Sequence, residues 1–318
     1  MRRTATAVLA AAALTLVAAC GGGDSEETNA EGDTKIKVGV IPIVDTAPIW
    51  LGKEKGFFEE EGLDLEITTT TGGAAAVPGV VSGDFDFAFG NVMSLMVAAD
   101  QGLPVEFVTN GTSASGQTDA DFGAVIVPTD SPIKSAKDLT GKTVSVNNLK
   151  NIGDTTVRAA IEKDGGNPDD VDFIEVPFPD APAALSKKQV DAIWVLEPFM
   201  SQAIADGGRV VSYNYVEMSP QLDIAGYFTT KQYIAENKDV VERFTRAMNK
   251  SLDYAGENDQ EVRDIVGTYT KIDEATRAKM VLPVFRSEFD RASMETLGAA
   301  AVTYDTLKSE PDLDALLP

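Results

Sequence analysis

Short apolar runs alternate along the chain with stretches whose apolar residues recur every three or four positions. Runs rich in Val, Ile and Phe predict strands, and the periodic stretches predict amphipathic helices. In the first part of the chain the pattern predicts strands at 35–41, 64–70, 85–89 and 105–109, and helices at 47–61, from Gly72-Gly73 to Ser82, and at 91–101. Strands and helices that alternate in this order are typical of an α/β fold.

A second series of the same kind follows a strand predicted at 122–127. It comprises strands at 143–147, 171–176, 192–195 and 210–211, and helices at 135–142, 154–164 and 182–188. A strand at 225–229 then returns to the first unit, and the chain is predicted to be helical from Lys231 onward. We therefore expect two lobes, with residues 35–127 and 228–318 in lobe one and 128–227 in lobe two. Two connections at one hinge are the anatomy of a clamshell that closes on a ligand.

The N-terminus has a separate pattern. Arg2 and Arg3 precede an apolar run at 7–19 that is shorter than the roughly 20 residues of a membrane-spanning helix. This layout predicts a secretory signal peptide at 1–19. The run ends in Leu-Val-Ala-Ala-Cys20, which resembles the bacterial lipobox, and that resemblance implies cleavage before Cys20 and lipidation of its thiol. The alternative is a free Cys beside an ordinary cleavage site.

Composition adds to this picture. Residues 20–34 are mostly Gly, Ser, Glu, Asp and Asn, which predicts a flexible tether. Loss of residues 1–19 would remove only Arg2 and Arg3 from the 27 basic residues, leaving 25 against 50 acidic ones and a charge of about −25. Such an acidic chain is not expected to bind nucleic acid or anionic lipid head groups.

Two residue counts restrict the chemistry. The sequence has no His, which excludes a Ser-His-Asp triad and His metal sites, and Cys20 is its only Cys. We expect no enzyme activity, no cofactor and no metal site.

Five segments carry a family resemblance. They read KVGVIPIVDTAPIW at 37–50, GKEKGFFEEEGLDL at 52–65, VSGDFDFAFG at 81–90, KDLTGK at 137–142 and VDAIWVLEPF at 190–199. They resemble the type II periplasmic binding proteins for nitrate, taurine, aliphatic sulfonates and thiamine pyrimidine precursors. The resemblance spans 35 to about 300. It implies a two-lobe α/β fold, a small-molecule ligand in the cleft, delivery to an ABC permease with a cytoplasmic ATPase, and a monomer outside the cytoplasmic membrane.

The candidate ligand-binding residues lie where predicted strands lead into helices. Ligands of α/β sheets bind beyond the carboxyl ends of strands, where helix N-termini present free N–H groups. By resemblance the same loops line the pocket. The candidates are Asp45, Thr46, Trp50, Gly72, Gly73, Asn91, Ser94, Asn151, Gly153, Asp154, Thr155, Trp194 and Glu197.

Each candidate also has a structural interpretation. Asp45, Thr46, Asn91 and Ser94 fit helix caps, and the glycines fit turns. Trp50 and Trp194 fit either a cleft wall or the core. Glu197, which precedes a proline, fits either a cleft carboxylate or a solvated loop acid.

Charge bears on the ligand class. The candidate loops carry Lys150 and Arg158 but also Asp45, Asp154 and Glu197. Carboxylates accept hydrogen bonds from amino groups and disfavour bare anions. This favours a nitrogen-bearing ligand such as an aminopyrimidine over nitrate, and a sulfonate with an amine, such as taurine, stays compatible.

Three classes of function remain to be compared. The first is a lipid-anchored importer subunit. The second is an enzyme: relatives in this fold group include thiamine pyrimidine synthases that consume an active-site His, which this sequence lacks. The third is a sensor ectodomain that binds ligand without a permease, and a nitrate-type anion binder is a variant of the first.

Overall fold

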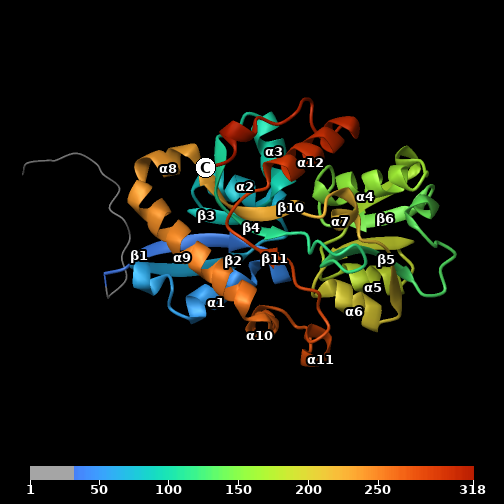
Figure 1. The fold of residues 1–318 in the computed structure, drawn as a ribbon, viewed down its shortest axis with the longest axis horizontal. Helices are drawn as coiled ribbons and strands as arrows, with labels where there is room; N and C mark the ends of the chain where they lie inside the picture. Colours follow the sequence, from blue (N-terminus) through green and yellow to red (C-terminus); the bar gives the residue numbers. More distant parts are fainter. Residues whose placement is uncertain (1–31) are drawn as a thin grey trace, which may run out of the picture.

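The computed structural model describes residues 32–318, which form two α/β halves, each built around a mixed sheet (Figure 1). The predicted signal peptide at 1–19, the lipidation site Cys20 and most of the predicted tether lie outside the described residues. Within residues 32–318, no helix is both long and apolar enough to cross a membrane.

The first half contains a six-stranded sheet in the order β11-β4-β10-β3-β1-β2. Its strands are β1 (Thr34–Val40), β2 (Leu63–Thr69), β3 (Phe87–Asn91), β4 (Val105–Ser113), β10 (Asp223–Thr230) and β11 (Val284–Phe285). β1 pairs in parallel with β2 and β3, whereas β10 runs antiparallel between β3 and β4. The parallel strands therefore direct their carboxyl ends toward one edge.

Helices cover this sheet. They are α1 (Ala47–Glu54), α2 (Gly73–Ser82), α3 (Val92–Asp100), α8 (Lys231–Glu236), α9 (Lys238–Glu257), α10 (Asp259–Tyr269) and α12 (Arg291–Thr303), with 3-10 turns at Val44–Thr46, Glu59–Glu61 and Leu313–Ala315. α9 buries Val240, Phe244 and Leu252 on one face, and Phe244 stacks on Phe87 with a 4.0 Å centroid distance. The predicted helix at 47–61 stops at Glu54, because Gly56 takes a left-handed backbone (φ 78°).

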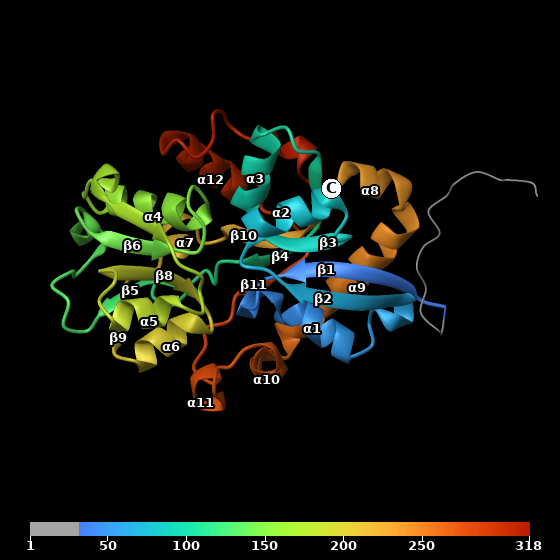
Figure 2. The same ribbon diagram turned by 180° about the vertical axis from the view of Figure 1, so that it is seen from behind.

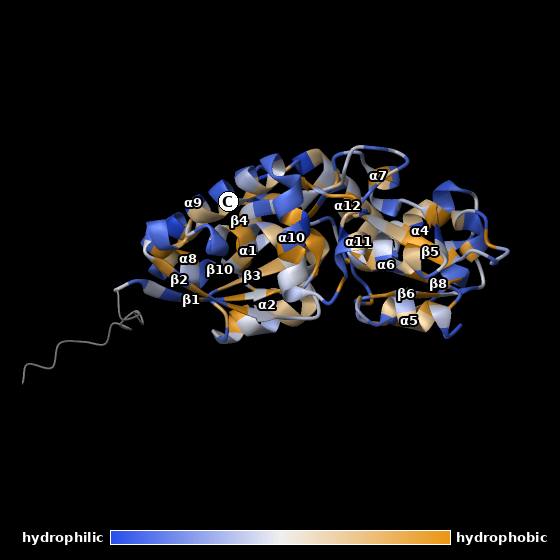
Figure 3. Cartoon of the chain, turned by 90° about the horizontal axis from the view of Figure 1, so that it is seen from below, coloured by the Kyte–Doolittle hydropathy of each residue, from blue (hydrophilic) through white to orange (hydrophobic). Residues whose placement is uncertain are grey.

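The second half contains a five-stranded sheet in the order β7-β6-β8-β5-β9. Its strands are β5 (Gly123–Pro128), β6 (Thr143–Val146), β7 (Asp172–Glu175), β8 (Ala192–Leu196) and β9 (Gly208–Ser212). The helices are α4 (Ile152–Lys163), α5 (Ala181–Ser186), α6 (Phe199–Ala205) and α7 (Asn214–Met218), with 3-10 turns at Ala136–Leu139 and Pro168–Asp170. The short helix α11 (Glu274–Arg277) packs between α10 of the first half and α6 of the second. The short helix and turn expected at 135–142 is present as the first of these 3-10 turns, with Ser135 as its N-cap. Apolar residues concentrate on both sheets and on the inner helix faces (Figure 3).

Sheet membership moves the expected lobe boundaries. β5 pairs with β8 and β9, so residues 123–127 belong to the second sheet rather than to lobe one. β10 pairs with β3 and β4, so the expected boundary between 227 and 228 divides a strand of the first sheet. The crossings therefore fall between Ser113 and Gly123 and between Met218 and Asp223 (Figure 2). A buried strand has a similar apolar composition in either sheet, so its pattern does not reveal its partners.

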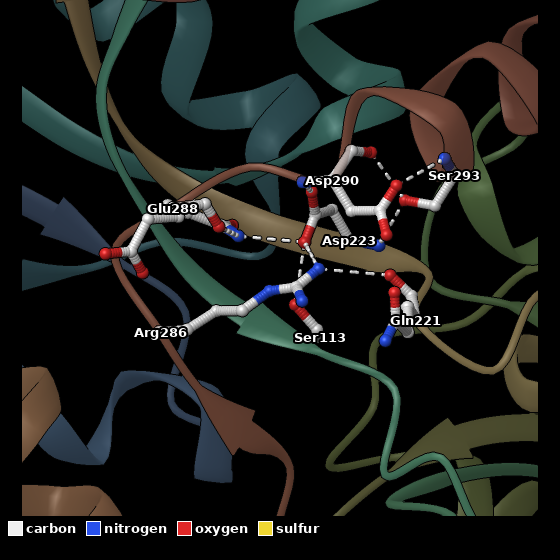
Figure 4. A network of polar contacts seen from close by, with 8 residues as sticks. Ser113, Gln221, Asp223, Arg286, Glu288, Asp290 and Ser293 are labelled. Carbon is white, nitrogen blue, oxygen red and sulfur yellow. Dashed lines mark hydrogen bonds and ion pairs between the residues drawn. The ribbon is translucent and has the colours of Figure 1, made fainter.

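The buried carboxylate of Asp223 makes contacts with several chain segments near the two crossings (Figure 4). Asp223, at the start of β10, accepts hydrogen bonds from Ser113 Oγ at 2.7 Å and Asn110 Nδ2 at 2.8 Å, both on β4. It also pairs with Arg286 Nη2 at 2.6 Å and accepts from the backbone N–H of Asp290. Three chain segments are therefore fixed at this point: the end of β4, the start of β10, and the loop before α12.

Candidate functional site

A cavity with an empty volume of about 330 Å³, part of it open to solvent, lies between the two halves. Both halves contribute to its lining, which consists of Ile41, Ile43, Asp45, Gly72, Gly73, Phe89, Gly90, Asn91, Asn147, Ile152, Phe178, Trp194, Leu196, Tyr215, Ile224 and Ala225. The mixture of apolar walls with a few polar groups is typical of small-molecule sites.

Strand ends and helix N-termini converge on this cavity. Gly73 is the first residue of α2, Asn91 is the N-cap of α3, and Ile152 is the first residue of α4. Helix N-termini carry partial positive charge and unpaired N–H groups. A Cβ at Gly73 would lie 2.7 Å from Ser94 Oγ and 3.0 Å from Gly90 Cα, so only glycine lets α2 approach β3 this closely.

Four polar atoms on the cavity lining are buried and have no hydrogen-bond partner within the described residues. They are Asp45 Oδ2, Asn147 Oδ1, Trp194 Nε1 and Tyr215 Oη. Buried polar groups in proteins are almost always hydrogen-bonded, so each free one needs a ligand or a water molecule. The set has an indole donor, two oxygen acceptors and a hydroxyl that can do either.

Asp45 is the acidic residue of this set. Its side chain is 1% exposed, and its Oδ1 accepts a hydrogen bond from Thr112 Oγ1 at 3.1 Å. Burial raises the pKa of Asp45 from 3.8 to about 7, against the opposing effect of the Thr112 bond. No Lys or Arg is among the residues that line the cavity. When ionised, Asp45 accepts hydrogen bonds from a ligand that carries donors, and a lining without a cation does not balance the charge of a bare anion.

Trp194, on β8, forms one wall. Its side chain is 1% exposed and packs against Phe178 at 5.3 Å and edge-on against Tyr215 at 5.7 Å between ring centroids. A Cβ at Gly153 would lie 2.5 Å from the indole, so this glycine makes room for the ring. Trp194 is therefore both a core residue and a cavity residue. The two alternatives that its sequence position left open, a cleft wall and the core, are both correct.

Thr46 and Trp50 do not line the cavity. Thr46 Oγ1 donates to the carbonyl oxygens of Ile41 and Ile43 at 2.9 and 3.1 Å, which fixes the loop after β1. Trp50 stacks on Tyr269 of α10 with a 5.0 Å centroid distance and a 14° interplanar angle. The Trp50 ring therefore packs between α1 and α10.

Ser94 and Asn151 join the two halves. Asn151 Nδ2 donates to Ser94 Oγ at 3.1 Å, while the side chains of Asn91 and Asn151 cap α3 and α4. These bonds lie beside the cavity but are made within the protein. They bring the N-termini of two helices from opposite halves together.

Asp154 and Thr155 are also occupied by protein contacts. Asp154 accepts from the backbone N–H groups of Lys150 and Asn151 at 2.8 and 2.7 Å as part of a capping box. The hydroxyls of Thr155 and Thr306 lie 3.3 Å apart, which joins α4 to the C-terminal region. Neither residue lines the cavity.

Glu197 lies outside the cavity and is not a solvated loop acid either. It is fully buried, and it accepts hydrogen bonds from Ser201 N–H (3.0 Å), Ser201 Oγ (2.8 Å) and Val281 N–H (3.1 Å). It therefore links α6 to the segment after α11. Burial raises the pKa of Glu197 from 4.5 to about 7, although these three hydrogen bonds oppose the shift.

This raised pKa gives a testable pH dependence. The folded protein holds a proton on Glu197 up to about pH 7, whereas the unfolded chain releases it near pH 4.5. The stability that comes from this protonation is complete below pH 4.5 and is lost as the pH rises toward 7. We expect Glu197→Gln to reduce the fall in unfolding free energy between pH 5 and pH 8 by on the order of 3 kcal/mol. Urea unfolding of wild type and variant at pH 5 and at pH 8 measures this difference in unfolding free energy.

The matched control is Glu59→Gln, because Glu59 is exposed on the first half. It should leave the pH profile of wild type unchanged. If Glu197→Gln gives the same profile as Glu59→Gln, Glu197 does not titrate as described.

Several cavity residues were absent from the predicted set. Asn147 follows β6 directly. A polar residue at the end of a buried strand is the pattern that identified the other candidates, so Asn147 could have been predicted from the sequence. Phe178 lies in a Pro-Phe-Pro loop, and Tyr215 lies on the short helix α7. Nothing local distinguishes these two rings from ordinary core residues.

Two α/β halves that are joined by crossing strands and enclose a cavity define the class of bilobal periplasmic binding proteins. An alkanesulfonate-binding protein from Xanthomonas axonopodis, solved with MOPS, has this fold with a TM-score of 0.73 and 14% identity, over 89% of this chain and 98% of its own. The nitrate-binding protein NrtA from Synechocystis has a TM-score of 0.72 and 16% identity, over 90% and 86%.

The chain belongs to the NMT1/THI5-like family, which matches residues 43–262. The formylaminopyrimidine-binding protein of Halalkalibacterium halodurans is 24% identical over 260 residues, which cover 78% of this chain and 75% of that protein. The predicted two-lobe fold and family resemblance are thus confirmed. The proteins named here are binding proteins rather than enzymes.

Proposed function

We propose that this protein is the solute-binding subunit of an ABC importer and captures a small organic molecule with N–H donors. The observation that carries this proposal is the free Oδ2 of buried Asp45, in a cavity whose lining has no cation. A free carboxyl oxygen at this depth requires a donor for compensation. The ligand N–H supplies it.

An aminopyrimidine fits the four free atoms best. Its amino group donates to Asp45, its ring nitrogens accept from Trp194 Nε1 or Tyr215 Oη, and its flat ring lies against the aromatic walls. A formylaminopyrimidine is also what the relative from Halalkalibacterium is named for. An amine-bearing sulfonate, with its anion at the helix N-termini, is the second candidate, because three such termini face the cavity.

Closure follows from contacts to both halves. Asp45 belongs to the first half, whereas Asn147, Trp194 and Tyr215 belong to the second. A ligand that bonds to both sets favours the closed arrangement, because only that arrangement makes all the contacts at once. The bond between Ser94 and Asn151 then adds a direct link between the halves. The closed form is the one that docks on the permease.

The same proposal places the protein outside the cytoplasmic membrane as a monomer anchored by lipid on Cys20. It rests on the signal-peptide pattern and on the names of periplasmic relatives. We expect cells that express wild type to incorporate radiolabelled palmitate into the protein. Cys20→Ser should abolish the label, and a label that persists would contradict the anchor.

The first test is a thermal-shift screen of the chain without residues 1–20 against nitrate, taurine, alkanesulfonates, aminopyrimidines, thiamine and riboflavin. A specific ligand raises the midpoint of unfolding by mass action. A shift with aminopyrimidines supports the proposal, and a shift with nitrate alone contradicts the ligand class. Uptake of the same compound should disappear in a deletion strain, and retained uptake would favour a sensor.

Asp45→Asn tests the central contact. We expect a ten- to hundredfold weaker Kd for an aminopyrimidine by calorimetry, because a hydrogen bond to a charged group contributes about 1.5–3 kcal/mol. Asp253→Asn, on the exposed face of α9, is the matched control and should bind like wild type. Equal affinity of Asp45→Asn and wild type would remove Asp45 from the site.

A further inference from the structure

A second compartment, with an empty volume of about 570 Å³, lies beside the cavity. The two spaces share Ile41, Ile43 and Phe178 as common lining. Phe178 also packs on Trp194, so one aromatic ring forms part of both spaces. The outer compartment therefore adjoins the cavity.

The chemistry of the outer compartment differs from that of the cavity. One wall consists of Thr69, Thr70 and Thr71 at the end of β2, and the opposite wall of Pro177, Pro179 and Phe199. Its lining has no charged side chain. Prolines lack an N–H, so this wall offers little to a polar group. One hydrogen-bonding atom stands out, because Thr70 Oγ1 is buried without a partner in the described residues.

We infer that this compartment is a second subsite, which takes a flat apolar or weakly cationic ring attached to the polar group in the cavity. The inference rests on the proposed function. Because three residues line both spaces, a group bound beside Asp45 and Trp194 lies next to the threonine compartment, and the inferred ligand extends from one space into the other. Aromatic rings pack favourably against Phe side chains and attract positive rings over their faces. The Thr70 hydroxyl offers the attached ring one hydrogen bond.

Two probes separate the subsites. 4-Amino-5-hydroxymethyl-2-methylpyrimidine has only the polar ring for the cavity, and thiamine has the same ring with a thiazolium attached. We expect calorimetry on the chain without residues 1–20 to give at least a tenfold lower Kd for thiamine. Equal affinities, or binding of the pyrimidine alone, would overturn the second subsite and leave the proposed function intact. Failure of both probes would overturn the aminopyrimidine proposal and this inference together.

A matched pair of variants tests whether the attached ring of thiamine binds in this compartment. Thr69 and Thr68 are both exposed residues of β2, but alternate residues of a strand face opposite sides, and only Thr69 lines the compartment. Thr69→Phe should bring the ratio of the two Kd values to about one. Thr68→Phe should keep the wild-type ratio. A Thr69→Phe ratio equal to that of wild type would show that the attached ring lies elsewhere.

Discussion

Asp223→Asn is expected to lower the free energy of unfolding by about 3 kcal/mol, because it breaks a buried ion pair. Asp223 is fully buried and pairs with Arg286, whose side chain is 24% exposed. The asparagine keeps the shape but leaves Arg286 without its counter-charge. It also places an NH₂ group among donors, because Asn110, Ser113 and the N–H of Asp290 all donate to this carboxylate.

Because of where Asp223 lies, we expect its substitution to destabilise the whole fold rather than one element. Asp223 lies at the start of β10, and its partners lie on β4, in the loop before α12 and at the start of α12, where both crossings and the C-terminal region meet (Figure 4). Urea unfolding followed by circular dichroism gives the free energy. Asp253→Asn, an exposed change of the same type, should stay within about 0.5 kcal/mol of wild type.

A double-mutant cycle isolates the ion pair. Arg286→Met removes the cation and keeps an apolar stem. If the pair is the cause, Asp223→Asn combined with Arg286→Met should be less destabilised than the sum of the single variants. Strict additivity would assign the loss to the other donors around Asp223. A wild-type stability for Asp223→Asn would contradict the whole network.

Trp194→Ala is expected to lower the free energy of unfolding by about 3–5 kcal/mol and to abolish ligand binding. The indole is 1% exposed and fills the space between Phe178, Tyr215 and Gly153. Its removal leaves a large cavity in the second half and deletes one wall of the binding site. Urea unfolding measures the first effect, and calorimetry with an aminopyrimidine measures the second.

Trp194→Phe separates binding from folding. The phenyl ring keeps most of the packing of this cavity-lining residue but lacks the Nε1–H, which has no partner within the described residues. We expect an affinity about tenfold lower, at the upper end of what one neutral hydrogen bond contributes. Trp50→Phe is the control, since Trp50 lies against Tyr269 outside the cavity. If both Phe variants bind like wild type, the indole N–H makes no contact with ligand.

Asp45 and Glu197 show what a sequence position leaves undetermined. Both acids follow an apolar strand, and both are buried with a pKa raised to about 7. The segment after α11 brings the N–H of Val281 to Glu197, whose carboxylate is then occupied by protein donors. Asp45 accepts a side-chain hydrogen bond from Thr112 on one oxygen, while its Oδ2 has no partner within the described residues and is left for a ligand. Residues more than 60 positions away in the chain decide the difference.

The sequence by itself determined the alternation of strands and helices, the two-lobe fold and the family, because periodicity and local motifs are properties of neighbouring residues. It also predicted Asp45, Gly72, Gly73, Asn91 and Trp194, which line the cavity, because strand ends and helix starts can be recognised locally. Only the tertiary structure decided which sheet holds β5, why Trp50 faces α10, and how Tyr215 and Phe178 reach the cavity. Those outcomes depend on packing between segments far apart in the chain, which a local pattern does not encode.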